Sequence, residues 1–168
     1  MSKSFKTVVF SHGKESGPWG SKITAMAEVV RALGGEVQSI DYRGMEDPSA
    51  RVGKLLHEAR GMAGPLVLVG SSMGAHVSAA AAHELRPAAL FLLAPAFYMQ
   101  GFEQYTPKGS QVPTAIVHGW HDDIVPVDNA IRWAREEACA LHLLDSGHRL
   151  EDQIPVICTL LREFLLRL

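Results

Sequence analysis

A serine between two glycines follows one of the apolar runs of this sequence. Ser72 is the centre of Gly70-Ser71-Ser72-Met73-Gly74, which has the pattern G-x-S-x-G. The apolar residues 66–69 before it are typical of a buried strand, and the small residues 73–83 after it are typical of a helix. A sharp turn between them would strain the serine backbone and crowd its neighbours, where only glycine lacks a clashing Cβ. We interpret Ser72 as a nucleophile; the alternative is a tight turn of small residues without chemistry.

Two later loops contain residue types that could activate such a serine. Residues 119–126 read Gly-Trp-His-Asp-Asp-Ile-Val-Pro, and residues 145–148 read Asp-Ser-Gly-His. Together with the serine loop they resemble the α/β-hydrolase family, whose triad occurs in the order serine, acid, histidine. The resemblance implies that Asp122 is the acid, with Asp123 as runner-up. It also implies that His148 is the base, with His121 as the main competitor.

The loop after the first apolar run suggests where an oxyanion would be held. Residues 11–14 read Ser-His-Gly-Lys. The family often has His-Gly here, so the resemblance implies that the backbone N–H of Lys14 is one half of the oxyanion hole. The backbone N–H of Met73, directly after the nucleophile, would be the other half. The alternative for this loop is a glycine-rich turn into a helix.

The elements that must position these loops alternate along the chain. We expect strands at residues 7–10, 37–40, 66–69, 89–93, 114–118 and 141–144. A helix is expected after every strand except the fourth: Asp47 would cap the second helix, small residues would form the third, Asp128 would cap the fourth, and the last would start at about Asp152. Strands without polar alternation are buried on both faces, which indicates a parallel sheet covered by helices. The expected fold class is therefore α/β, a three-layer doubly wound sheet of about six parallel strands.

The family resemblance covers nearly the whole chain and makes that fold more specific. It implies the strand order 2-1-3-4-5-6, helices on both faces and a single minimal domain over residues 1–168. Residues 94–113 are about 20 residues long, too few for a folded lid, so we expect no cap domain. The resemblance is to small, capless, bacterial-type serine hydrolases of the esterase or thioesterase kind.

Composition excludes several classes of protein. The chain has 168 residues, 47% hydrophobic, and a formal net charge of −2, so nucleic acid and anionic membranes are poor candidate partners. Its two cysteines, Cys139 and Cys158, favour a reduced cytoplasmic protein with two buried thiols. Residues 1–6 are polar and lack the apolar core of a signal peptide. The histidines show no metal-ligand spacing and no G-x-G-x-x-G is present, so we predict no metal and no nucleotide cofactor.

The sequence leaves the substrate open. The expected partner is a small acyl molecule, and the leading hypothesis is hydrolysis of a carboxylic ester or thioester through an acyl-enzyme. Amide or peptide hydrolysis by the same triad is an alternative, as is a non-catalytic binding protein of the same fold. Several large apolar side chains could line an acyl pocket, or could instead form a local core. The leading candidates are Trp19, Phe97, Tyr98 and Trp120, and Met99, Phe102 and Tyr105 are further candidates in the segment 94–113.

Overall fold

A single sheet of six parallel strands forms the centre of the protein, in the order β2-β1-β3-β4-β5-β6. The computed structural model describes residues 5–168, so the first four residues of the polar N-terminal segment lie outside it. The strands are β1 (Thr7–Ser11), β2 (Glu36–Ile40), β3 (Leu66–Ser71), β4 (Ala89–Leu93), β5 (Thr114–Gly119) and β6 (Ala140–Leu144). Fold class and strand order are therefore confirmed.

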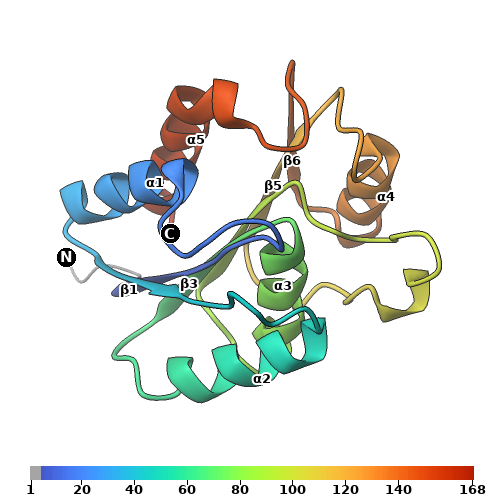
Figure 1. Ribbon diagram of the computed structural model, residues 1–168. Coiled ribbons are helices and arrows are strands. Elements are labelled where there is room, and N and C mark those ends of the chain that lie inside the picture. The colour runs from blue at the N-terminus through green and yellow to red at the C-terminus, as the bar shows by residue number, and fades with distance from the viewer. Residues whose placement is uncertain (1–4) are drawn as a thin grey trace.

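Helices cover both faces of this sheet (Figure 1). α1 (Ser21–Ala32) and α5 (Ile154–Leu166) pack together on one face, and the other face is covered by α2 (Pro48–Ala59), α3 (Met73–Leu85) and α4 (Val127–Glu137). One apolar cluster lies on each side of the sheet, which completes three layers. Two short 3-10 helices, Glu103–Tyr105 and Glu151–Gln153, lie in loops. Within residues 5–168 no helix has the length and apolar character needed to cross a bilayer.

The starts of two helices show how far local sequence determines structure. Asp47 caps α2 as predicted, because its carboxylate accepts hydrogen bonds from the amides of Ser49 (3.1 Å) and Ala50 (3.3 Å). The prediction that Asp128 caps α4 is wrong, since Pro126 occupies that position and Asp128 lies in the first turn. There its negative charge still interacts favourably with the positive end of the helix dipole.

The two edges of the sheet differ from the expectation of complete burial. The inner strands β1, β3 and β4 are almost wholly buried, as is β5. The edge strands β2 and β6 keep exposed or half-buried residues along most of their length, because each has a strand neighbour on one side only. Cys139 and Cys158 are free thiols that are partly rather than fully buried.

The strand order places a crevice beside the predicted nucleophile. The chain moves outward in one direction from β1 to β2 and in the other from β3 to β4. The loops after β1 and β3 therefore diverge at a switch point, where open α/β sheets bind ligands. In the described chain, the connection from β4 to β5 contains only the helix Glu103–Tyr105, so no cap domain covers this crevice.

Candidate active site

Ser72 lies on a strained turn between β3 and α3. Its backbone angles are φ 54° and ψ −116°, an unusual conformation for a residue with a side chain. The end of β4 and the loop after it hold the turn, because Ser72 N–H donates to Leu93 O (2.9 Å) and Ser72 O accepts from Ala96 N–H (3.1 Å). A Cβ on Gly70 would overlap the backbone of Gly74, and a Cβ on Gly74 would overlap the Ser11 carbonyl. The crowding expected at both glycines is confirmed.

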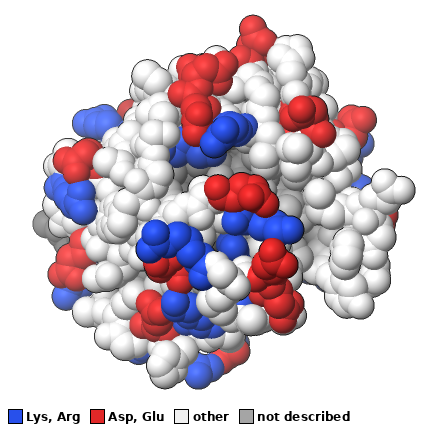
Figure 2. Space-filling view, in the orientation of Figure 1, with Lys and Arg blue, Asp and Glu red and all other residues white. Residues whose placement is uncertain are grey.

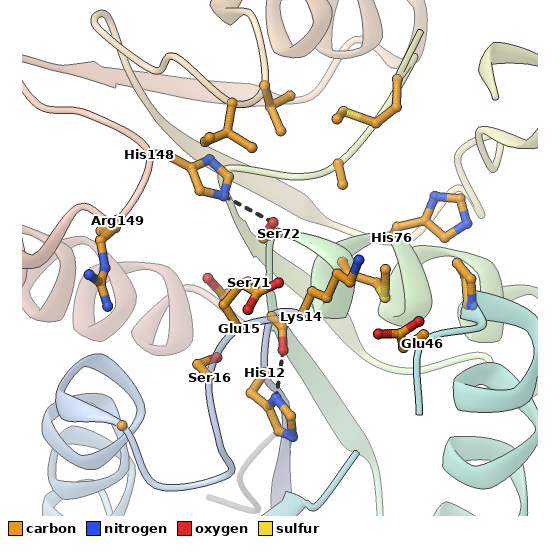
Figure 3. Close-up of a pocket in the computed structure, with 18 of the residues that line it drawn as sticks. His12, Lys14, Glu15, Ser16, Glu46, Ser71, Ser72, His76, His148 and Arg149 are labelled. Atoms are coloured by element: carbon orange, nitrogen blue, oxygen red, sulfur yellow. Dashed lines mark hydrogen bonds between the residues drawn. The ribbon is translucent and has the colours of Figure 1, made fainter. Parts of the chain in front are cut away.

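The structure brings the three predicted triad side chains together. His148 Nε2 lies 3.0 Å from Ser72 Oγ, and His148 Nδ1 lies 2.7 Å from Asp122 Oδ2 (Figure 3 shows the first pair). An ionised Asp122 can only accept, so His148 Nδ1 carries the proton and Nε2 presents a lone pair to the serine hydroxyl. This tautomer is the one that a general base for Ser72 requires.

Asp122 is held as a carboxylate by four donors. Its Oδ1 accepts from the amides of Ile124 (2.9 Å) and Val125 (2.7 Å), and its Oδ2 accepts from His148 and from His118 (3.1 Å). The side chain is completely buried. Burial by itself would raise the pKa of Asp122, but the hydrogen bonds from the two histidines and two amides outweigh it and hold the pKa well below its usual range.

The acid and histidine loops can meet because Gly119 has no side chain. A Cβ at this position would overlap the backbone of Ser146 and Gly147. The amide of Trp120 donates to Leu144 O (2.9 Å), and the amide of His121 donates to Ser146 O (3.0 Å). Two strand-end loops are thereby fastened together.

The two alternatives weighed for the acid and the base lie elsewhere. The His121 imidazole is 71% exposed and contacts Asp145 at 2.8 Å rather than the serine. Asp123 is exposed. The geometry therefore favours Asp122 and His148 over their neighbours.

The loop after β1 lies directly against Ser72. A Cβ on Gly13 would be 3.4 Å from the Ser72 Cβ, and Lys14 follows immediately. The loop is anchored from below by the wholly buried Arg51, whose Nη1 donates to the carbonyls of His12 (3.0 Å) and Gly13 (3.3 Å). His12 Nδ1 donates to Gly13 O (2.7 Å), and His12 Nε2 accepts from the amide of Tyr42 (2.8 Å).

A large cleft opens over these residues, with a volume of about 1380 Å³. Ser72, Met73, Lys14 and His148 all line it. Its charged side chains include Lys14, Lys22, Arg149, Glu15, Glu46 and Glu151. On the face drawn in Figure 2, acidic and basic side chains are likewise interspersed. The cleft thus presents charges of both signs beside the serine.

The predicted pocket aromatics need correction, because none of the four leading candidates lines the cleft. Phe97 is buried in the core, where its ring stacks on Trp133 with centroids 4.8 Å apart. Tyr98 turns away, donating to Glu136 (2.5 Å) and lying under the Arg132 guanidinium. Trp19 and Trp120 are half exposed outside the cleft. The other three candidates, Met99, Phe102 and Tyr105, do line the cleft, together with further apolar residues such as Ile124.

Sequence reasoning missed two buried residues that support the site. His118 contacts Asp122, and Arg51 anchors the loop before Lys14. Arg51 did leave a signal, because it lies four and eight residues before the buried Leu55 and Ala59 and so shares their helix face. Among residues 5–168, no three His, Cys, Asp or Glu side chains are grouped as ligands for a metal ion.

Comparison with known proteins agrees with this architecture. A protein from Xanthomonas campestris pv. campestris, assigned to the hydrolases of the alpha/beta superfamily, is 33% identical; the match covers 97% of this chain and 99% of that one, with a TM-score of 0.90. Est1E from Butyrivibrio proteoclasticus (17% identity, 99% and 89% covered, TM-score 0.84) and alpha/beta hydrolase domain-containing protein 10 from mouse (17%, 99% and 92%, 0.80) share the fold. No family model and no curated protein matches the sequence.

Proposed function

The chain belongs to the α/β-hydrolase superfamily, and we propose that it is a serine hydrolase that cleaves a small carboxylic ester or thioester through an acyl-enzyme on Ser72. One observation supports this most directly. Ser72 Oγ, His148 and Asp122 form a continuous chain of contacts of 3.0 and 2.7 Å. A non-catalytic binding protein would have no need to keep this chain intact, so the distances count against that alternative.

In the proposed reaction, His148 Nε2 takes the hydroxyl proton as Ser72 Oγ attacks the substrate carbonyl carbon. The carbonyl π electrons move to oxygen, and Asp122 stabilises the imidazolium. When the oxyanion collapses, the bond to the leaving oxygen or sulfur breaks and His148 returns the proton to that atom. Water, activated by the same histidine, then attacks the acyl-enzyme, releasing the acid and free Ser72.

The anchored loop after β1 suggests how the oxyanion would be held. The Gly13 carbonyl points toward the donors of Arg51 and His12. In a trans peptide the following N–H points the opposite way, so the Lys14 amide is fixed away from this buried anchor. The Met73 amide opens helix α3, where the first N–H groups lack partners within the helix. We propose these two amides as the oxyanion hole.

A fluorophosphonate probe tests the nucleophile, because it phosphonylates activated serines. The wild-type protein and the Ser71→Ala variant should both be labelled, and Ser72→Ala should not. Ser71 is the matched control because it is the adjacent serine and lines the same cleft. Labelling that survives the Ser72→Ala substitution would overturn the assignment. Turnover of matched oxygen esters, thioesters and amides then ranks the three bond types.

A further inference from the structure

Lys22 occupies a position beside the reacting groups that the proposed mechanism does not use. It is the second residue of α1 and lines the same cleft as Ser72. Its Nζ donates to the carbonyl oxygen of Arg149 (2.5 Å) and lies 3.4 Å from Ser71 Oγ. The ammonium group therefore lies between the residue before the proposed nucleophile and the residue after the proposed base.

The charge of Lys22 is not balanced by a close carboxylate. Within residues 5–168, no Asp or Glu oxygen lies within 4.0 Å of its Nζ. By contrast, the Nζ atoms of Lys6 and Lys54 lie 3.9 and 3.7 Å from glutamates. Glu15 also lines the cleft but forms no ion pair with Lys22. A partly buried ammonium that meets only neutral oxygens loses hydration without gaining an ionic partner.

The charged groups that act most strongly on Lys22 are one carboxylate and one guanidinium. Burial lowers the pKa of Lys22, Glu151 raises it, and Arg149 lowers it. Glu151 also lies 3.6 Å from the Arg149 guanidinium, so two cations share one carboxylate. Figure 3 shows Arg149 and Glu46 on opposite sides of the cleft and Glu15 near Ser71, although no ion pair joins Glu15 to Lys22.

We propose that Lys22 binds a carboxylate of the substrate, so that the preferred ester has an anionic group on its acyl or its alcohol part. The inference rests on the proposed serine hydrolase function and specifies its substrate class. An ammonium has three protons, and neutral oxygens lie near only two of them here. A substrate carboxylate would accept a hydrogen bond from the third N–H and would supply the missing countercharge.

Two pairs of esters that differ only in a carboxylate provide the test. Ethyl butyrate and monoethyl succinate place the charge on the acyl part. Phenyl acetate and the acetate ester of 3-hydroxybenzoate place it on the alcohol part. In at least one pair, kcat/KM of the wild-type enzyme should favour the charged member.

Substitution of Lys22 should remove that preference selectively. In Lys22→Met, kcat/KM for the charged ester should fall by about tenfold, the size expected for an ionic hydrogen bond, while the neutral ester is turned over as before. Lys22→Arg should keep the preference. Lys54→Met is the matched control, because Lys54 also donates to a backbone carbonyl, that of Asp41 (2.6 Å), but lies outside the cleft.

Binding without turnover separates this inference from the proposed function. Calorimetry of Ser72→Ala should detect monoethyl succinate or the 3-hydroxybenzoate ester, and the double variant with Lys22→Met should lose at least tenfold in affinity. The inference would be overturned if Lys22→Met lost kcat/KM equally for charged and neutral esters. It would also be overturned if the wild type showed no preference for charged esters and the Ser72→Ala protein bound them equally well with and without Lys22→Met. Neutral esters cleaved by the wild type but not by Ser72→Ala would leave the proposed function standing in that case.

Discussion

His118 Nε2 lies 3.1 Å from Asp122 Oδ2, the same oxygen that His148 Nδ1 contacts at 2.7 Å. Both the His118 and Asp122 side chains are completely buried. His118 Nε2 also lies 2.9 Å from Val125 O, whereas its buried Nδ1 has no partner. An unpaired lone pair is tolerated more easily than an unpaired N–H, so the proton belongs on Nε2. We infer that His118 is a neutral donor that shares the carboxylate charge with His148.

Removing this donor should alter the pH dependence of the reaction. In His118→Leu, the Asp122 carboxylate no longer contacts His118 and interacts more strongly with the protonated imidazole of His148. Protonation of His148 is then favoured, so the acidic limb of the pH profile of kcat/KM should move to higher pH. The value at the optimum should nevertheless fall by about tenfold, because Asp122 loses one of the contacts that orient it toward His148. His118→Gln retains an N–H near the Nε2 position and should restore the wild-type profile. Lower activity in His118→Leu with an unchanged profile would indicate a purely structural role.

Because Asp122 is ionised in the folded protein, the free energy of unfolding should depend on pH in the acidic range. The folded pKa of Asp122 lies below the unfolded value of about 3.9, so the stabilisation is fully present above the unfolded value and is lost progressively as the pH falls from there toward and through the folded pKa. Between pH 6 and pH 3 the wild type should lose about 1 kcal/mol more of its unfolding free energy than Asp122→Asn. Urea titrations at each pH measure this. The exposed neighbour Asp123 provides the control, because Asp123→Asn should follow the wild type.

The apolar runs indicated buried strands, and the resemblance to the α/β-hydrolase family then pointed to the loops that follow three of them. The G-x-S-x-G pattern also reports backbone crowding, which the structure shows at Gly70 and Gly74. His118 could not be recognised in this way, because its function depends on burial and on which oxygen it faces. It ends an apolar run, where a histidine is more often a core residue.

The cleft wall was harder to predict, for a physical reason. An aromatic residue in a loop can turn toward the core or toward the cleft, and the sequence pattern is the same. Phe97 turns inward because Trp133, on α4, offers it a stacking partner. Phe102 and Tyr105, from the same loop, remain about two thirds exposed at the cleft. Only the packing of α4 against the sheet decides between these outcomes.

Arg51 should matter for activity as well as for stability. Arg51→Met removes the donors to the carbonyls of His12 and Gly13 and leaves buried acceptors less well satisfied. The unfolding free energy should fall by about 1–3 kcal/mol. Because the Lys14 amide loses its fixed direction, kcat should fall more than KM changes. Arg60→Met, which removes an exposed guanidinium from an ion pair with Glu84, should change neither. A destabilised Arg51→Met with full kcat would contradict the role in orienting Lys14.

Two glycines should respond in opposite directions to the same added methyl group. A Cβ on Gly53, inside α2, meets no atom within 4 Å, so Gly53→Ala should stabilise the protein by about 0.5–1 kcal/mol through helix propensity. A Cβ on Gly74 meets the Ser11 carbonyl, backbone that cannot rotate away, so Gly74→Ala should destabilise by about 1–3 kcal/mol. Moving α3 off β1 would also shift Ser72 relative to the Lys14 loop. Fluorophosphonate should therefore label Gly74→Ala more slowly than the wild type, whereas Gly53→Ala should be labelled at the wild-type rate. Equal labelling rates for the two variants would show that the close approach at Gly74 does not position the serine.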